Sequence, residues 1–444
     1  MQNSKEPDAG DSNAGYTPVR APRGTAISCR GWQQEAALRM LMNGVDPDVA
    51  EHTESLLASS ELGVVAADWT AFRALADSLR SLSGDATLLA QQGKMTGVIH
   101  TSQDSPRALI LDSDPAANWA YIGPQEFLPE AHEFFAAAGE KYFGGDLGGK
   151  LIAGAGMSGP RAALPLATTM NGAAFLGIDP HSERIKRSVK TGFCDVMVND
   201  LDEALRILKN SVRKHEAASV GLIGNPANVI SEMASRGVVP DLLADIAASQ
   251  DVEALKRLQD GTCALQALGS TVLKPFVAEN ASDSIHWVAL SGEASDIQRI
   301  DGLLLEFFAD DQPLGRWIRT LKRRVRHRGL PARACLLSAE QRGRFGVAVN
   351  RLVARREVKA PVVIVRQALT YMNRGSESPK TRESTPPSGN ELAALLKLAG
   401  GATWASIHRD ERGRARVTAQ AIVADGTSEM DTRIESVLNA RSLP

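Results

Sequence analysis

The feature that most constrains the fold of this chain is a glycine-rich turn, GAGMSG, at residues 154–159. The turn ends the short apolar run LIAGAG (151–156) and comes directly before a predicted helix at 161–170. A run of this kind, apolar at every position, is typical of a strand buried on both faces of a parallel sheet. The sequence therefore places a strand–turn–helix unit in the middle of the chain.

The spacing of the three glycines matches a dinucleotide-binding turn. Gly154 allows the tight turn, Gly156 lets the backbone approach a diphosphate, and Gly159 lets helix and strand pack closely. The next apolar run, AAFLGID, ends at Asp179, where a carboxylate is placed to hold ribose hydroxyls. The alternative is a glycine-rich turn in a parallel sheet that binds no ligand.

Short apolar runs alternate with amphipathic helices from Trp119 to Gln259, which predicts a doubly wound parallel sheet with helices on both faces. Strand-like runs also occur before this region (86–111) and after it (286–292 and 360–365), so a second α/β domain is expected. The predicted organisation is a flexible tail at 1–22, a first part of a core domain at 23–118, a Rossmann-like domain at 119–268, and a second part of the core at 269–444 with a flexible insert at 373–391.

Composition excludes several classes of protein. The 444 residues carry a net charge of −2 and only 5% aromatic residues, which argues against nucleic-acid binding and against a polybasic membrane patch. No apolar stretch reaches membrane-spanning length, and the four scattered cysteines form no CxxC pair. No metal-binding spacing is present. We therefore expect a reduced, cytoplasmic protein without a metal, in which the basic helix at 316–328 is either a solvated face or pairs with nearby acids such as Asp310 and Asp311.

Two further residues have alternative interpretations. Asn225 follows a predicted strand and precedes Pro226, so it either reaches a cofactor at the strand end or caps the next helix. Cys335 lies at the end of the run PARACLL, where it is either an inert buried thiol or a reactive one with a pKa lowered by neighbouring Arg333.

Many strings of the chain match one family in the family's own order. The matching strings are RGTAISCRGWQQEAALRMLMN, LLAQQGKMTGVIHTSQDSPRALI, NWAYIGPQEF, YFGGDLGGKLIAGAG, PLATTMNGAAFLGIDPHSERI, GLIGNPANVISEMASRGVVPD, HWVALSG, GLPARACLL, APVVIV, GGATWASIH and AIVADGT. On these strings the sequence resembles the urocanate hydratase (urocanase) family over nearly all of residues 20–430.

The resemblance implies a lyase of histidine catabolism in which tightly bound NAD acts as an electrophile, so that water adds to a conjugated imidazole acid. It also implies a homodimer, a small-molecule substrate, and a cofactor domain inserted into a discontinuous core. Residue by residue, it implies a cofactor role for Asp179, Arg184, Asn225 and the turn glycines, a catalytic role for Cys335, and a place near the substrate carboxylate for Lys274.

The same comparison reveals departures at the expected active site. The family's YGGTG reads SSELG at 59–63, its TDQTSAH reads ADIAASQ at 244–250, its RDHLDSG reads RQALTYM at 366–372, and its HHGGG segment reads IHRDE at 407–411. Both aspartates of the third segment are lost, which removes titratable groups whose acid–base help is typically worth about 10²–10⁴ in rate.

Three functions remain open on the sequence. The first is a urocanase-like hydratase acting on an imidazole-acrylate-type or related conjugated acid with an altered site. The second is a non-catalytic paralogue, a pseudoenzyme that binds a nucleotide or a partner. The third is a plain NAD-dependent dehydrogenase.

Overall fold

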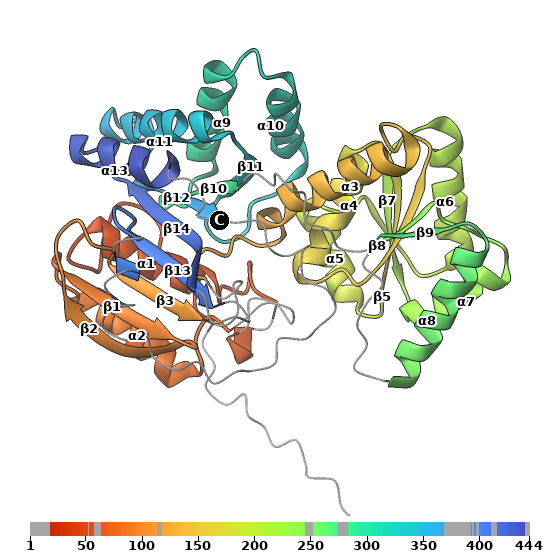
Figure 1. Ribbon diagram of the computed structural model, residues 1–444, viewed down its shortest axis with the longest axis horizontal. Helices are drawn as coiled ribbons and strands as arrows, with labels where there is room; N and C mark the ends of the chain where they lie inside the picture. The colour runs from red at the N-terminus through yellow and green to blue at the C-terminus, as the bar shows by residue number, and fades with distance from the viewer. Residues whose placement is uncertain are drawn as a thin grey trace, which may run out of the picture.

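The computed structural model describes residues 18–51, 53–56, 64–112, 118–244, 252–273, 283–367, 392, 395–396, 399–409 and 415–439. The chain forms two α/β domains that lie side by side, each built on one sheet (Figure 1). The predicted insert at 373–391, Lys274 and most of the predicted tail lie outside the described residues.

Six parallel strands form the sheet of the Rossmann-like domain, in the order β6-β7-β5-β4-β8-β9. The strands are β4 (Leu151–Ala155), β5 (Ala174–Asp179), β6 (Val196–Val198), β7 (Ala218–Ile223), β8 (Leu242–Ala244) and β9 (Thr271–Leu273). Every residue of β4 and β5 is buried, as the unbroken apolar runs predict. The chain passes from β4 to one side of the sheet and later returns to its other side at β8, so the strand order reverses at β4.

Helices cover both faces of this sheet. The helical segments are η2 (Pro124–Glu126), α3 (Leu128–Phe143), η3 (Gly159–Ala163), α4 (Leu164–Met170), α5 (Ser182–Thr191), α6 (Leu201–Lys214), α7 (Pro226–Ser235) and α8 (Val252–Ala267). Leu151 and Ala153 face the apolar cluster of α6, α7 and α8, whereas Ile152 faces the cluster that contains α3 and α4. This confirms the doubly wound domain.

The core domain contains an eight-stranded mixed sheet in the order β11-β10-β12-β14-β13-β3-β1-β2. The strands are β1 (Ala86–Gln91), β2 (Lys94–His100), β3 (Ala108–Asp112), β10 (Ser284–Ala289), β11 (Ala332–Leu336), β12 (Val362–Gln367), β13 (Trp404–Arg409) and β14 (Ala415–Ala424). Since β3 pairs with β13, strands from before and after the Rossmann-like domain share one sheet. The Rossmann-like domain is therefore inserted into a discontinuous core, as expected.

The two faces of the eight-stranded sheet bury different clusters. One face carries Val288, Val365 and Trp404 and packs against α1 and the segment from Trp119 to Ala138. The other carries Ile285, Trp287 and Ile364 and packs against the later helices. The helical segments of this domain are α1 (Trp32–Asn43), η1 (Thr53–Ser55), α2 (Trp69–Ser81), α9 (Ala294–Phe307), α10 (Gln312–Arg324), α11 (Ala339–Ala354) and α13 (Ser428–Asn439).

Two predictions need correction. The basic helix predicted at 316–328 is α10 (Gln312–Arg324), which begins earlier because Asp311 caps it by accepting a hydrogen bond from Leu314 N (3.0 Å), with Pro313 in its first turn. The predicted domain boundary at 268 falls before β9, the last strand of the six-stranded sheet. In the described part of the chain, no helix combines the length and the apolar character that crossing a membrane requires.

Candidate functional site

A cavity of about 300 Å³ lies between the two domains, beside the carboxyl end of β4. In open α/β sheets, ligands bind at this position, where the strand order reverses. The Rossmann-like domain contributes residues 122–125, Met157, Ala162 and one face of α5, and the core domain contributes residues 48–51 and 325–332 in part. The cavity therefore depends on both domains.

The glycine turn has the backbone geometry that the sequence predicts. Gly154 is closely packed, because a Cβ there would lie 3.0 Å from the Phe175 ring and 3.2 Å from the carbonyl oxygen of Ala244. Gly156 and Gly159 have φ values of +87° and +49°, which favour glycine. The turn is thus built like a phosphate-binding turn.

Asp179 lies at the end of β5 with none of its side chain exposed, and it faces the turn. Its Oδ2 accepts a hydrogen bond from Met157 N and its Oδ1 accepts one from His181 N, both at 2.8 Å. Arg184 Nη1 lies 3.7 Å from the same Oδ2. The structure therefore brings Asp179 and Arg184 together beside the turn, but Asp179 binds the chain's own backbone.

A second carboxylate reaches the turn from the core domain. Glu51 Oε1 accepts a hydrogen bond from Gly159 N at 2.8 Å. Gly156 N donates to Ile178 O, also at 2.8 Å. The N–H groups of Gly156, Met157 and Gly159 thus all have acceptors within the chain. A diphosphate entering here would meet the negative charge of Glu51, so the turn as it stands does not fit a dinucleotide.

Two further side chains complete this end of the sheet. Met157 is 2% exposed, and its sulfur lies against β5 and β7, where a Cβ at Gly177 would come within 2.8 Å of it. Asn225 Oδ1 accepts hydrogen bonds from Ala227 N (2.9 Å) and Asn228 N (3.4 Å). Asn225 therefore caps α7, which is the structural alternative that the sequence left open.

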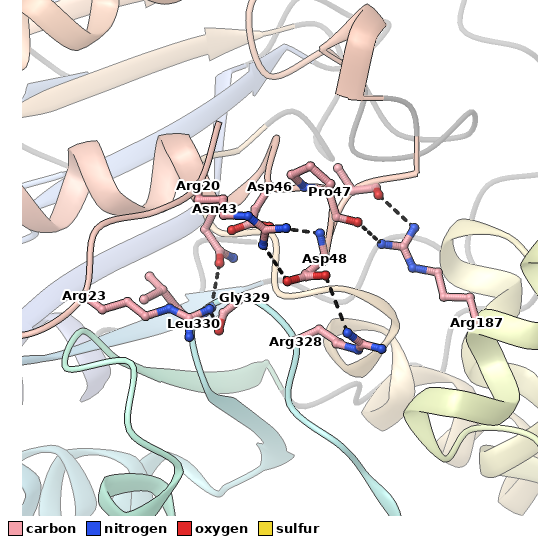
Figure 2. Close-up of polar contacts among 11 residues, drawn as sticks. Arg20, Arg23, Asn43, Asp46, Pro47, Asp48, Arg187, Arg328, Gly329 and Leu330 are labelled. Atoms are coloured by element: carbon pink, nitrogen blue, oxygen red, sulfur yellow. Dashed lines mark hydrogen bonds and ion pairs between the residues drawn. The ribbon is translucent and has the colours of Figure 1, made fainter. Parts of the chain in front are cut away.

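Arginines enter the cavity from both domains. Figure 2 shows Arg187 extending from α5 to the segment after α1, where it donates to the carbonyl oxygens of Ala50 (2.8 Å) and Pro47 (2.9 Å). Arg328 approaches the same segment from the other side, 3.5 Å from Asp48. These contacts hold α5 against the core domain.

A buried polar chain supports the cavity from the core side. Asp301 Oδ2 lies 3.2 Å from Arg333 Nε, and Arg333 Nη1 lies 3.2 Å from Nε2 of His327, which lines the cavity. Burial, helped by the Arg333 charge, lowers the pKa of His327 to about 3. Because a guanidinium only donates, Nε2 is the acceptor and the neutral ring carries its proton on Nδ1.

Three family models match this chain in succession. The urocanase N-terminal domain matches residues 19–136, the urocanase Rossmann-like domain matches residues 123–254, and the urocanase C-terminal domain matches residues 278–442. Together they span almost the whole sequence. The chain belongs to the urocanase family. Its Rossmann-like domain is the central match, which agrees with the inserted six-stranded sheet.

Cys335 lies apart from the cavity in this urocanase-family chain. Ala332 lines the cavity, but Cys335 is three positions further along β11 and points to the opposite sheet face. The thiol is 1% exposed in an apolar cluster. Burial, together with the charges of Asp301 and Asp311, raises its pKa well above the usual value. Of the two alternatives that the sequence leaves open, the structure thus favours the buried, inert thiol, and Arg333 is instead paired with Asp301.

A carboxyl group lies beside a position where the family's acid is lost. Gln367 stands where the first aspartate of RDHLD is expected, and its Nε2 donates to Glu126 Oε1 at 2.8 Å. Glu126 is 4% exposed, and burial raises its pKa to about 7. Glu126 lies in the matching string NWAYIGPQEF, but its contact with residue 367 depends on the fold and cannot be predicted from that string.

Sequence reasoning also missed Glu51, Gln125 and His327. Gln125 lies in NWAYIGPQEF, a string that carries the family resemblance but indicates no role for this residue, whereas Glu51 and His327 belong to none of the matching strings. No group of three or more metal-ligating side chains occurs within the described ranges.

Proposed function

We propose that this urocanase-family chain has lost the dinucleotide-dependent hydration of its family and keeps the interdomain cavity as a binding site for a small anionic compound. The hydrogen bond from Gly159 N to Glu51 carries the proposal, because it puts a carboxylate where a diphosphate would bind. The burial of Asp179 supports it, because its side chain has no exposed surface and both of its oxygens accept backbone N–H groups of the chain itself, those of Met157 and His181.

A direct assay of the purified protein tests this proposal. We expect no NAD in the supernatant after denaturation, no thermal stabilisation when NAD is added, and no loss of urocanate absorbance. Stoichiometric NAD, or a thermal shift at micromolar NAD, would overturn the proposal, since ligand binding to the folded state alone must stabilise it.

A urocanase-like hydro-lyase acting on an imidazole-acrylate-type or related conjugated acid is the second candidate. Glu126 favours it, because a carboxyl with a pKa of about 7 beside Gln367 has the acid–base character that the lost aspartate would have supplied. Urocanate turnover that falls at least 100-fold in E126Q would select this candidate. The homodimer, the cytoplasmic location and the role of Lys274 stay predictions.

A further inference from the structure

Asp301, Arg333 and His327 form a polar triad at the wall of the cavity. Asp301 comes from α9 and Arg333 from β11, whereas His327 lies in the segment that joins α10 to β11. The side chain of Asp301 has no exposed surface, and that of Arg333 is 2% exposed. His327 is half-buried and lines the cavity. The triad therefore runs from the interior of the core domain to the space between the domains.

The guanidinium of Arg333 is fixed by two acceptors besides His327. Its Nε lies 3.2 Å from Asp301 Oδ2, and its Nη1 donates to the carbonyl oxygen of Ala332 at 3.4 Å. The same Nη1 lies 3.2 Å from Nε2 of His327. Because Asp301 offsets the charge of Arg333, the guanidinium can stay buried beside the imidazole without a ligand.

The contact with Arg333 fixes the protonation of His327. A guanidinium has only donors, so a proton on Nε2 would face the Nη1–H group. A doubly protonated ring would also place two positive charges 3.2 Å apart in a largely buried site, which disfavours that form as well. The low pKa of His327, about 3 through burial and the charge of Arg333, agrees with this geometry.

The polar group that the His327 ring leaves free is Nδ1–H. Among the described residues Nδ1 has no hydrogen-bond partner, and it is not sealed from solvent, in contrast to both ring nitrogens of His286. Since Arg333 occupies Nε2, the neutral ring has no basic nitrogen left with which to take a proton from a ligand. His327 is left with one function at the cavity, which is to donate a hydrogen bond.

We propose that Arg333 and Asp301 are positioning residues that hold His327 as a neutral Nδ1–H donor at the cavity. In this role His327 selects a hydrogen-bond acceptor, an oxygen or an unprotonated nitrogen, in the compound that the cavity binds. A ligand with an N–H or O–H at this point would leave two donors facing each other, and a mismatch of this kind costs more than a missing contact. The inference rests on the proposed function only in requiring a ligand in the cavity.

The test is nitrogen-15 NMR of the full chain with labelled histidine at neutral pH, because the ring nitrogen shifts distinguish the two neutral tautomers and the charged ring. H327Q assigns the signals, and His181, which lines the same cavity, is the internal reference. We expect the wild-type His327 to be the Nδ1–H tautomer. An Nε2–H tautomer, or a ring protonated on both nitrogens, would overturn the inference even if no variant folds.

Variants assign the tautomer to its causes. R333M removes the donor to Nε2 and should change the tautomer ratio at least tenfold toward Nε2–H. D301L should change the ratio in the same direction, since Arg333 loses the acceptor at Nε. R328M is the matched control, because Arg328 follows His327 in the sequence and lines the cavity but contacts Asp48. An unchanged ratio in R333M or D301L, or an equal change in R328M, contradicts the positioning role.

Two neutral rings of similar size probe the recognition role, because pyridine only accepts a hydrogen bond and pyrrole only donates one. Pyridine at millimolar concentration should shift the Nδ1 signal of wild-type His327, and pyrrole should not. An equal or larger shift with pyrrole, or no shift with either ring, would overturn the selection of an acceptor. Tight NAD binding would instead overturn the proposed function and leave the tautomer result as it stands.

Discussion

At the scale of single residues, Glu51 is the side chain that most changes the expected site. Glu51, which belongs to the core domain, accepts a hydrogen bond from the N–H of Gly159 at the start of η3. Replacing it by alanine frees an N–H donor and removes a negative charge next to the turn. We expect E51A to bind inorganic diphosphate at least tenfold more tightly than the wild type does, which corresponds to about 1.4 kcal/mol.

Calorimetry on E51A and on E340A measures this effect. Glu340 is an exposed carboxylate in the first turn of α11, so its removal changes the net charge equally without touching the turn. Equal affinity gains in E51A and E340A would mean that the effect is only one of overall charge.

Cysteine reactivity provides a second prediction at this scale. Cys263 is exposed, whereas Cys29, Cys194 and Cys335 are buried. Because burial raises the pKa of Cys335, its thiolate is scarce as well as inaccessible. A thiol reagent should label Cys263 alone in the native protein at neutral pH, with the other three thiols reacting after denaturation. Rapid native labelling of Cys335, located by peptide mass spectrometry, would contradict its placement in the apolar cluster.

At the scale of elements, Glu126 links η2 to the end of β12 through Gln367. The folded state raises the pKa of Glu126 from an unfolded value of about 4.3 to about 7. The folded protein therefore binds more protons than the unfolded chain between these values. The stability from this group is present below about pH 4 and is lost as the pH rises through 7.

The variant E126Q lacks this titration. Relative to the wild type it should gain stability as the pH rises, by up to about 3 kcal/mol between about pH 4 and about pH 8. Urea unfolding at several pH values measures the difference. His286, whose pKa burial lowers to about 3, opposes the trend below about pH 6.5 in both proteins, so it cancels in the comparison. A difference that is constant with pH would contradict the buried, protonated state of Glu126.

At the scale of the whole molecule, the two domains are in close contact where the end of α5 meets the end of α10. Gly192 follows α5 with φ +85°, and a Cβ there would overlap the backbone oxygen of Arg324 at the end of α10. Next to it, Arg326 N of the core domain donates a hydrogen bond to Thr191 O of the Rossmann-like domain (3.0 Å). An alanine at 192 must therefore separate the two domains locally.

Gly237 is a matched control for Gly192, because it also has a positive φ (+64°) but a Cβ added there would have no atom within 4 Å. Chemical denaturation should show G192A less stable than G237A by about 2 kcal/mol or more, since G237A bears only the backbone strain of about 1–2 kcal/mol. Equal losses of stability in the two variants would mean that the contact between α5 and α10 is not tightly packed.

The sequence predicted the parts of this molecule that depend on local patterns. The buried parallel strands, the glycine turn and the place of Asp179 follow from apolar runs and from residue types at fixed spacing. The hydrogen bond from Gly159 N to Glu51 could not be predicted from the sequence, because Glu51 lies 108 residues from Gly159 along the chain and belongs to no motif. Likewise, the face of β11 on which Cys335 lies depends on strand register, and a shift of one residue would reverse it.

The most direct test of the central claim is a titration of NAD into the purified wild-type chain, followed by calorimetry. The claim is that Asp179 and Glu51 accept hydrogen bonds from N–H groups of the glycine turn and so prevent NAD from binding there. It predicts no saturable binding up to millimolar NAD. Saturable binding at micromolar NAD, lost in G156A and retained in G237A, would contradict the claim and restore the turn as a cofactor site.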